Sequence, residues 1–168
     1  MKTIITMKTI KGDLVKLAAE GHFNVVIHGC NCWNSMGAGI ALQLAKRFPQ
    51  VRTVDELTNP GDPKKLGNAS IAAVRGDYDD AILVVNAYTQ FNTATKPGEC
   101  VVDYDAIYKV FNTVVYNIAC MSKDIRIGIP MIGAGLAGGN WSLIKLIIEE
   151  ALSGFYHPNL ITLVEYDG

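Results

Sequence analysis

The chain has 168 residues, 49% of them hydrophobic and 18% charged, which favours a folded core over disorder. Lys and Arg number 15 and Asp and Glu number 16, so the formal charge is −1. This balance gives no electrostatic reason to expect binding to nucleic acid or to an anionic membrane. The length predicts one domain over residues 1–168.

Strands and helices alternate in the first part of the chain. Residues 3–10 predict a β-branched strand, and Asp13 is a good N-cap for a short helix after it. The apolar run at 23–28 predicts a strand buried on both faces. A loop rich in Gly, Asn and Ser follows over 29–39, and apolar residues at helical spacing then predict a helix that stops at Pro49.

The middle of the chain predicts a hairpin and a long helix. Residues 58–70 carry two prolines and two glycines and predict a surface loop. The strands of the hairpin are predicted at 71–75 and 81–88. A polar loop follows over 89–102, and a helix with one apolar face begins near Asp103.

Three further elements complete the pattern. Residues 126–130 predict a short strand, Asn140 caps a helix over 141–152, and residues 160–166 predict a closing strand. Strand–helix alternation gives a mostly parallel sheet with helices on both faces, and the hairpin adds an antiparallel pair. The expected fold class is therefore α/β, one αβα domain with a mixed sheet.

Two glycine-rich loops, at 35–40 and 133–139, each connect a strand to a helix. Ligands of open α/β sheets bind outside the carboxyl ends of the strands. Glycine lets the backbone approach a ligand, and helix N-termini present free N–H groups to anions, so two such loops suit a diphosphate. A purely structural turn is the alternative for either loop alone. Neither loop matches the P-loop or the dinucleotide-binding motif.

The cysteines favour a reducing compartment. Cys30, Cys32, Cys100 and Cys120 form neither a disulfide framework nor a zinc-ligand pattern, so we expect reduced thiols, a cytoplasmic location and no metal or cofactor. The first eleven residues lack the apolar region of a signal peptide, and no apolar run approaches the ~18–20 residues of a membrane span.

Four segments together resemble the macro domain, and within it the small ADP-ribose-1''-phosphate phosphatase branch. They are GDL (12–14), VVIHGCNC (25–32), MGAGIA (36–41) and IGIPMIGAGL (127–136). The likeness covers nearly the whole chain. It implies a three-layer αβα sandwich with a mixed, mostly parallel six-stranded sheet, and a cleft for ADP-ribose over the strand ends.

The resemblance also implies residue roles. Asp13, with Leu14 beside it, accepts a hydrogen bond from the adenine amino group, Asn31 holds the distal ribose, and Tyr166 stacks on adenine. The diphosphate and distal-ribose loops comprise Met36, Gly37, Ala38, Gly39 and Ile40, and Ile132, Gly133, Ala134, Gly135, Leu136, Ala137 and Gly138. The simpler alternatives are a helix cap for Asp13, a turn former for Asn31 and a half-buried strand-end residue for Tyr166.

His28 is the candidate catalytic residue. It stands where many macro domains carry asparagine, and the phosphatase branch, which this sequence resembles, has histidine there. A histidine titrates near neutral pH, so it could protonate a leaving oxygen or activate water if its ring points toward the distal ribose. The alternative is a hydrogen-bonded structural histidine.

Another macro-domain branch uses a lysine nucleophile with an aspartate in the second loop. Those positions hold Gln90 and Ala137, which cannot form an imine or move a proton, so that mechanism is disfavoured. The sequence thus predicts a metal-independent ADP-ribose-1''-phosphate phosphatase. The alternatives are a non-catalytic ADP-ribose reader, with ADP-ribosylated protein as a partner, and a hydrolase of ADP-ribosyl esters or O-acetyl-ADP-ribose.

Overall fold

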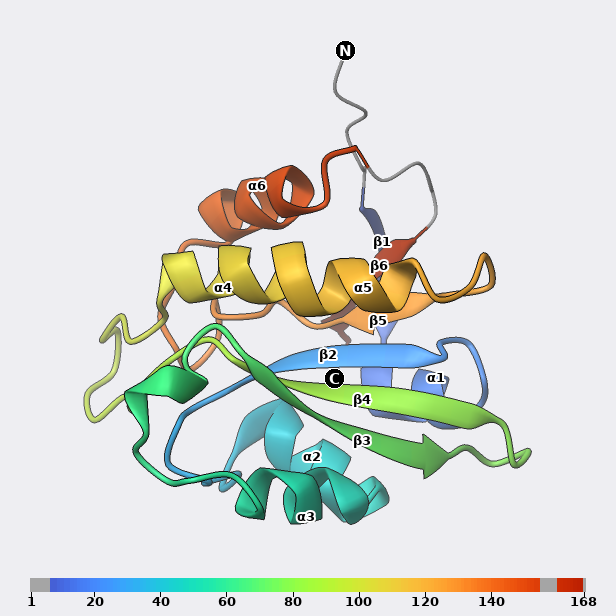
Figure 1. The fold of residues 1–168 in the computed structure, drawn as a ribbon, viewed down its shortest axis with the longest axis horizontal. Helices are drawn as coiled ribbons and strands as arrows, with labels where there is room; N and C mark the ends of the chain where they lie inside the picture. Colours follow the sequence, from blue (N-terminus) through green and yellow to red (C-terminus); the bar gives the residue numbers. More distant parts are fainter. Residues whose placement is uncertain (1–6, 155–159, 168) are drawn as a thin grey trace.

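The computed structural model of the chain describes residues 7–154 and 160–167. Residues 3–6 of the first predicted strand lie outside these ranges. The described strands form one sheet in the order β1-β6-β5-β2-β4-β3 (Figure 1). Its members are β1 (Lys8–Gly12), β2 (Val25–Cys30), β3 (Ala69–Arg75), β4 (Ala81–Tyr88), β5 (Ile127–Ile129) and β6 (Ile161–Tyr166).

The sheet is mixed, as the sequence predicts. Every neighbouring pair is parallel except β3 and β4, which are the antiparallel hairpin. β2 lies in the interior of the sheet, between β5 and β4. Its residues are buried on both faces, apart from the half-buried Gly29, because helices cover both sides of the sheet.

Helices cover both faces and complete the αβα sandwich (Figure 1). One layer holds α1 (Leu14–Ala19), α2 (Gly39–Arg47) and α3 (Gln50–Glu56). The other holds α4 (Tyr104–Val110), α5 (Tyr116–Ala119) and α6 (Trp141–Ala151), with a π-helical turn (Phe111–Val115) between α4 and α5. The expected fold class is confirmed.

The core is divided by the sheet into two buried clusters. Successive side chains of a strand point to opposite faces, so Val25 and Ile27 pack against α4 and α6, whereas Val26 and Cys30 pack against α1 and α2. By this alternation, His28 belongs to the α1–α3 side of the sheet.

Two local expectations need correction. The predicted strand at 23–28 is found at Val25–Cys30, so His28 is inside the strand and not at its carboxyl end. Pairing decides this boundary, since His28 lies opposite Asn86 and Cys30 opposite Tyr88. The sequence pattern predicts a stop at Pro49 and therefore omits α3. Pro49 follows α2 and is the N-cap of α3, a position where the missing N–H of proline costs no helical hydrogen bond.

Candidate functional site

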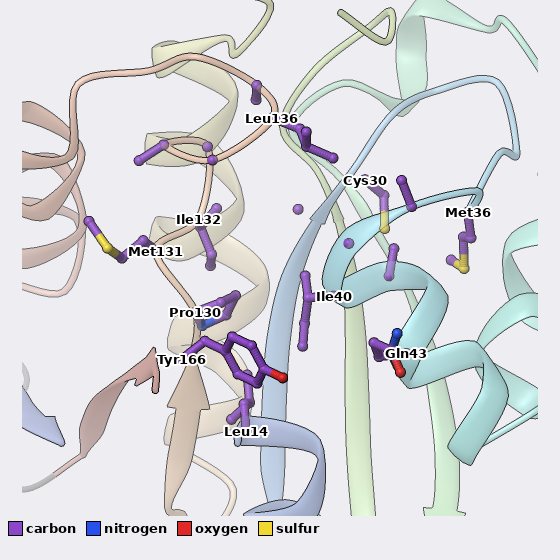
Figure 2. Close-up of a pocket in the computed structure, with 18 of the residues that line it drawn as sticks. Leu14, Cys30, Met36, Ile40, Gln43, Pro130, Met131, Ile132, Leu136 and Tyr166 are labelled. Atoms are coloured by element: carbon purple, nitrogen blue, oxygen red, sulfur yellow. The ribbon is translucent and has the colours of Figure 1, made fainter. Parts of the chain in front are cut away.

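A cleft of about 1570 Å³ lies over the carboxyl ends of the strands, between the two glycine-rich loops (Figure 2). Fifteen of the site residues predicted from the sequence line this cleft. They are Asp13, Leu14, Asn31, Met36, Gly37, Ala38, Gly39, Ile40, Ile132, Gly133, Ala134, Gly135, Leu136, Ala137 and Tyr166. His28 and Gly138 do not line the cleft.

One end of the cleft is formed where β1 meets β6. Leu14 is buried there, and the Tyr166 side chain is 76% exposed and faces the cleft near Leu14 and Ile40 (Figure 2). An exposed ring at the rim of a cleft is free to stack on a planar ligand. The half-buried alternative for Tyr166 is therefore wrong.

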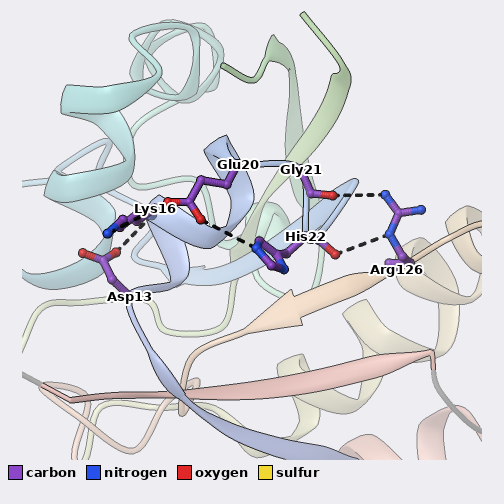
Figure 3. A network of polar contacts seen from close by, with 6 residues as sticks. All are labelled: Asp13, Lys16, Glu20, Gly21, His22 and Arg126. Carbon is purple, nitrogen blue, oxygen red and sulfur yellow. Dashed lines mark hydrogen bonds and ion pairs between the residues drawn. The ribbon is translucent and has the colours of Figure 1, made fainter. Parts of the chain in front are cut away.

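Asp13 lies at the same end and caps α1. Its Oδ1 accepts a hydrogen bond from the Lys16 backbone N–H at 3.1 Å, which confirms the cap (Figure 3). A carboxylate has further acceptor capacity, so the cap leaves Asp13 able to bind a ligand donor. At the other end of α1, Arg126 donates to the carbonyl oxygens of Gly21 and His22 and fastens the helix to β5.

The first glycine loop leads into α2. The N-cap residue Ala38 makes no side-chain hydrogen bond, so the first-turn N–H groups of this helix have no side-chain partner at the cap. Gly39 has φ +60°, a conformation that favours glycine. Together with the helix dipole, these N–H groups make this wall of the cleft suitable for an anion.

The second loop approaches the first through Leu136. Its Cδ1 lies 3.6 Å from the position that a Cβ on Gly39 would occupy, although the Leu136 side chain is 72% exposed. Leu136 therefore reaches toward the first loop across the cleft (Figure 2). The loop itself is closed by the Gly139 N–H, which donates to the Gly133 carbonyl oxygen at 2.7 Å.

The glycines of the second loop have two different roles. A Cβ on Gly135 would meet nothing within 4 Å, so this residue leaves open space in the cleft. A Cβ on Gly138 would lie 2.3 Å from the Glu99 carbonyl oxygen, and its φ is +72°. Gly138 was predicted to bind substrate, but it packs instead against the neighbouring loop.

Asn31 marks the opposite end of the cleft and shapes a turn. Its Oδ1 accepts from the Trp33 N–H at 2.8 Å, and its Nδ2 donates to the Ser35 carbonyl oxygen at 2.9 Å. The turn-forming role is confirmed. One N–H and one lone pair of the amide remain for a ligand, so the ribose role stays a prediction.

His28 does not face the cleft. The residue is fully buried, and its Nε2 lies 2.6 Å from Asn86 Oδ1. Asn86 in turn donates to the Val51 carbonyl oxygen of α3 at 3.0 Å. The prediction that the ring points toward the distal ribose is wrong, because the strand continues for two residues beyond it. Burial lowers the pKa of His28 to about 4, so the ring is neutral at pH 7.

A buried polar network extends from Asn86 behind the loop that carries Asn31. Asn86 Nδ2 donates to Ser70 Oγ at 3.0 Å, Ser70 Oγ lies 2.8 Å from the Tyr88 hydroxyl, and that hydroxyl donates to Asp55 Oδ1 at 2.7 Å. Asp55 is 1% exposed, and burial raises the pKa of its carboxyl. Sequence patterns missed this network, since Asp55 resembles an ordinary surface residue of a helix.

No family model matches the chain. It is 39% identical over 146 residues to an uncharacterized 17.5 kDa protein from the tk-vs intergenic region of Enterobacteria phage T4, covering 85% of this chain and 88% of that protein. It is 22% identical to an ADP-ribose 1''-phosphate phosphatase of Debaryomyces hansenii, covering 86% of this chain and 93% of that enzyme.

The solved structures agree on the architecture. The macrodomain of Mycobacterium tuberculosis DarG superposes with a TM-score of 0.69 at 18% identity, covering 96% of this chain and 97% of that chain. Thermosipho africanus DarTG in complex with ADP-ribose also gives 0.69, at 15% identity, covering 98% of this chain and 43% of that chain. The chain has the macro-domain fold.

The cleft of this macro domain has few groups that titrate. Its titratable lining residues are Asp13, Cys30, Lys46, Arg47, Glu165 and Tyr166. At the Asn31 end only Cys30 belongs to this set, and burial raises the pKa of its thiol well above the usual range, so it is neutral. Gln90, which stands at the position of the other branch's lysine, lines the cleft together with Ala137.

Two further features, a metal site and a membrane span, were sought in the described residues. Within residues 7–154 and 160–167, no group of three or more His, Cys, Asp or Glu residues is placed to hold a metal ion. Within the same ranges, no helix is long and apolar enough to cross a membrane.

Proposed function

We propose that this macro domain binds ADP-ribose along the cleft. Adenine lies at the Asp13 and Tyr166 end, the diphosphate lies between the two glycine loops, and the distal ribose lies at Asn31. The observation that carries this proposal is that one continuous cleft joins these ends and passes the uncapped N-terminus of α2. The Thermosipho relative, which shares the fold, is described in complex with ADP-ribose.

Local geometry supports anion binding despite the net charge of −1. The first residues of α2 line the cleft, and Lys46 and Arg47 of the same helix also contribute to the lining. Arg47 is already paired with the Asp77 carboxylate, so Lys46 is the side-chain cation with more freedom to approach a phosphate. Backbone amides and the helix dipole carry the larger part of the recognition.

We further propose that the cleft hydrolyses ADP-ribose-1''-phosphate, as the name of the Debaryomyces hansenii relative suggests. Water attacks the phosphorus, the P–O bond to the ribose breaks, and ADP-ribose and inorganic phosphate leave. One proton of the water passes to a phosphate oxygen and from there to the departing ribose oxygen, which leaves as a hydroxyl, because no side chain beside Asn31 among the described lining residues can accept it. Backbone N–H groups of the second loop stabilise the charge on phosphate, and the free part of the Asn31 amide orients the water.

A non-catalytic reader is the second candidate. The absence of a titrating side chain near Asn31, among the residues the structure describes, favours it. A phosphate-release assay on ADP-ribose-1''-phosphate separates the two functions. Release that falls in Asn31→Ala supports the phosphatase, and no release above the uncatalysed rate supports the reader. Parallel assays on an ADP-ribosyl ester and O-acetyl-ADP-ribose test the third alternative.

The first prediction is an order of affinities. ADP-ribose should bind more tightly than ADP, and ADP more tightly than AMP, because each added group engages another part of the cleft. Isothermal titration calorimetry with the three ligands measures this order. Equal affinities for AMP and ADP-ribose would show that the cleft beyond the adenine end makes no contact with the ligand.

The second prediction separates the two roles of Asp13. Asp13→Ala should weaken AMP binding by about 1–3 kcal/mol through the lost adenine hydrogen bond, and it should cost about 1 kcal/mol of folding stability through the lost cap. Asp13→Asn is the matched control, because asparagine caps helices as well as aspartate does. A normal melting temperature with weakened AMP binding in Asp13→Asn supports the adenine role. Unchanged binding in both variants leaves Asp13 as a cap alone.

A further inference from the structure

We propose that Lys65 is a positioning residue for the end of the cleft that holds the distal ribose. This inference rests on the proposed binding of ADP-ribose. Lys65 is 8% exposed and lies in the 3-10 turn Pro63–Lys65, outside the cleft lining. Its ammonium group contacts Cys32 and Asn34, on the side of their loop that faces away from the cleft. The same loop carries Asn31, which lines the cleft.

The ammonium group has a complete set of partners. Nζ donates to the Cys32 carbonyl oxygen at 3.1 Å and to Asn34 Oδ1 at 2.5 Å. It also lies 4.6 Å from the centroid of the Tyr88 ring, a cation–π distance. The three N–H bonds thus have two oxygens and a ring face as partners. Asp55, bonded to the Tyr88 hydroxyl, supplies a nearby negative charge.

The same loop is fastened at neighbouring points. The Cys32 carbonyl oxygen also accepts from the Gly61 N–H at 2.7 Å, and the Trp33 ring lies so close to Gly61 that a Cβ there would be 2.6 Å from it. Asn34 has φ +58° and donates from Nδ2 to the Thr58 carbonyl oxygen at 2.8 Å. Lys65 is the charged group that holds the loop at Cys32 and Asn34, and Arg52 donates to the Met36 carbonyl oxygen at 3.3 Å further along.

The front of the loop is part of the cleft. Asn31 and Ser35 line it, and they are joined to each other by the Asn31 Nδ2 bond. A carbonyl held from behind at Cys32 therefore sets where the Asn31 amide lies. Displacement of a binding group by about 1 Å weakens a directed hydrogen bond strongly. Removing the ammonium should shift this end of the cleft and leave in place the adenine end, which is formed where β1 meets β6.

The loss should not unfold the protein. Without the ammonium, the Cys32 oxygen keeps the Gly61 N–H, and Asn34 Oδ1 keeps the Thr58 hydroxyl at 3.1 Å. Lys65→Met retains the apolar stem of the side chain and removes only the charge. Lys64→Met is the matched control, because the Lys64 side chain is exposed in the same turn.

The experiment compares the affinities of ADP-ribose and AMP by calorimetry. We expect Lys65→Met to weaken ADP-ribose about tenfold or more while AMP changes less than about twofold. Lys64→Met should match the wild type for both ligands. A wild-type ratio of the two affinities in Lys65→Met overturns the proposal, whereas general destabilisation would lower both affinities together.

A second readout needs no ligand. With Trp141→Phe as background, the fluorescence of Trp33 reports on the loop alone. Acrylamide quenching should increase in Lys65→Met if the loop is released, and unchanged quenching overturns the proposal. The quenching experiment tests the role of Lys65 even if the wild type fails to bind ADP-ribose. Failure of the wild type to bind would refute the proposed function, not the role of Lys65 in holding the loop.

If Lys65→Met does not fold, Asn34→Gly takes its place. Glycine accepts the φ of +58° and removes the Oδ1 that Lys65 binds. The same change in affinity ratio and in quenching is expected. Wild-type behaviour of a folded Asn34→Gly on both measures counts against the proposal.

Discussion

Replacing Gly135 with valine is expected to weaken ADP-ribose binding by about 100-fold or more, equivalent to about 2.7 kcal/mol, without lowering the melting temperature. A Cβ at this position would meet no neighbouring atom within 4 Å, and Gly135 lines the cleft, so a larger side chain takes up space in the cleft. The backbone φ of Gly135 is not positive, so the substitution does not force a side chain into the left-handed conformation. Calorimetry and thermal melting measure the two quantities separately.

Gly138→Val is the matched control for steric bulk in the same loop. Here a Cβ would lie 2.3 Å from the Glu99 carbonyl oxygen, and φ is +72°. We therefore expect a large loss of stability and not a selective loss of binding. A Gly135→Val protein that binds ADP-ribose as tightly as the wild type would show that the second loop does not touch the ligand.

The wild type is expected to lose about 3 kcal/mol of stability between pH 7 and pH 4 because of His28 alone. In the folded protein, burial lowers the pKa of this histidine to about 4, whereas the unfolded chain takes up the proton near pH 6.5. The unfolded state thus binds more protons inside this window. The stability contributed by neutral His28 is complete above about pH 6.5 and disappears as the pH falls toward 4.

Urea unfolding at several pH values, compared between wild type and His28→Gln, measures this contribution. Glutamine can still donate to Asn86 Oδ1 but does not titrate. The comparison removes the effect of Asp55, whose raised carboxyl pKa acts in the opposite direction. If the wild type and His28→Gln lose stability in parallel between pH 6.5 and 4, His28 is not buried in its neutral form.

Local signals in the sequence predicted much of the fold. Asp13, Asp103 and Asn140 all cap helices with their side chains, because capping depends only on residues three positions apart. The hairpin and the two glycine loops are likewise local. α3 was missed because a proline that ends one helix can also begin the next, and composition does not separate these cases.

The candidate site was predicted where motifs are continuous and missed where partners are distant in sequence. Each glycine loop is one continuous segment between a strand and a helix, so most of its residues reach the cleft together, although Gly138 packs against the neighbouring loop. The orientation of His28 depends instead on pairing with Asn86, 58 positions away, and on how far the strand continues. The position of Lys65 beneath Cys32 depends on tertiary packing alone, so no pattern around either residue reveals it.

The pairing of β1 with β6 has a consequence for the order in which the molecule assembles. Gly12 lies opposite Tyr166, about 150 positions along the chain, whereas the β3–β4 hairpin closes within a few residues. Joining such remote segments carries the larger entropy cost and is the slower kind of step in folding. The wall that holds Asp13 and Tyr166 is therefore completed only when this long-range contact forms, so a nascent chain acquires its full cleft after both segments have been synthesised.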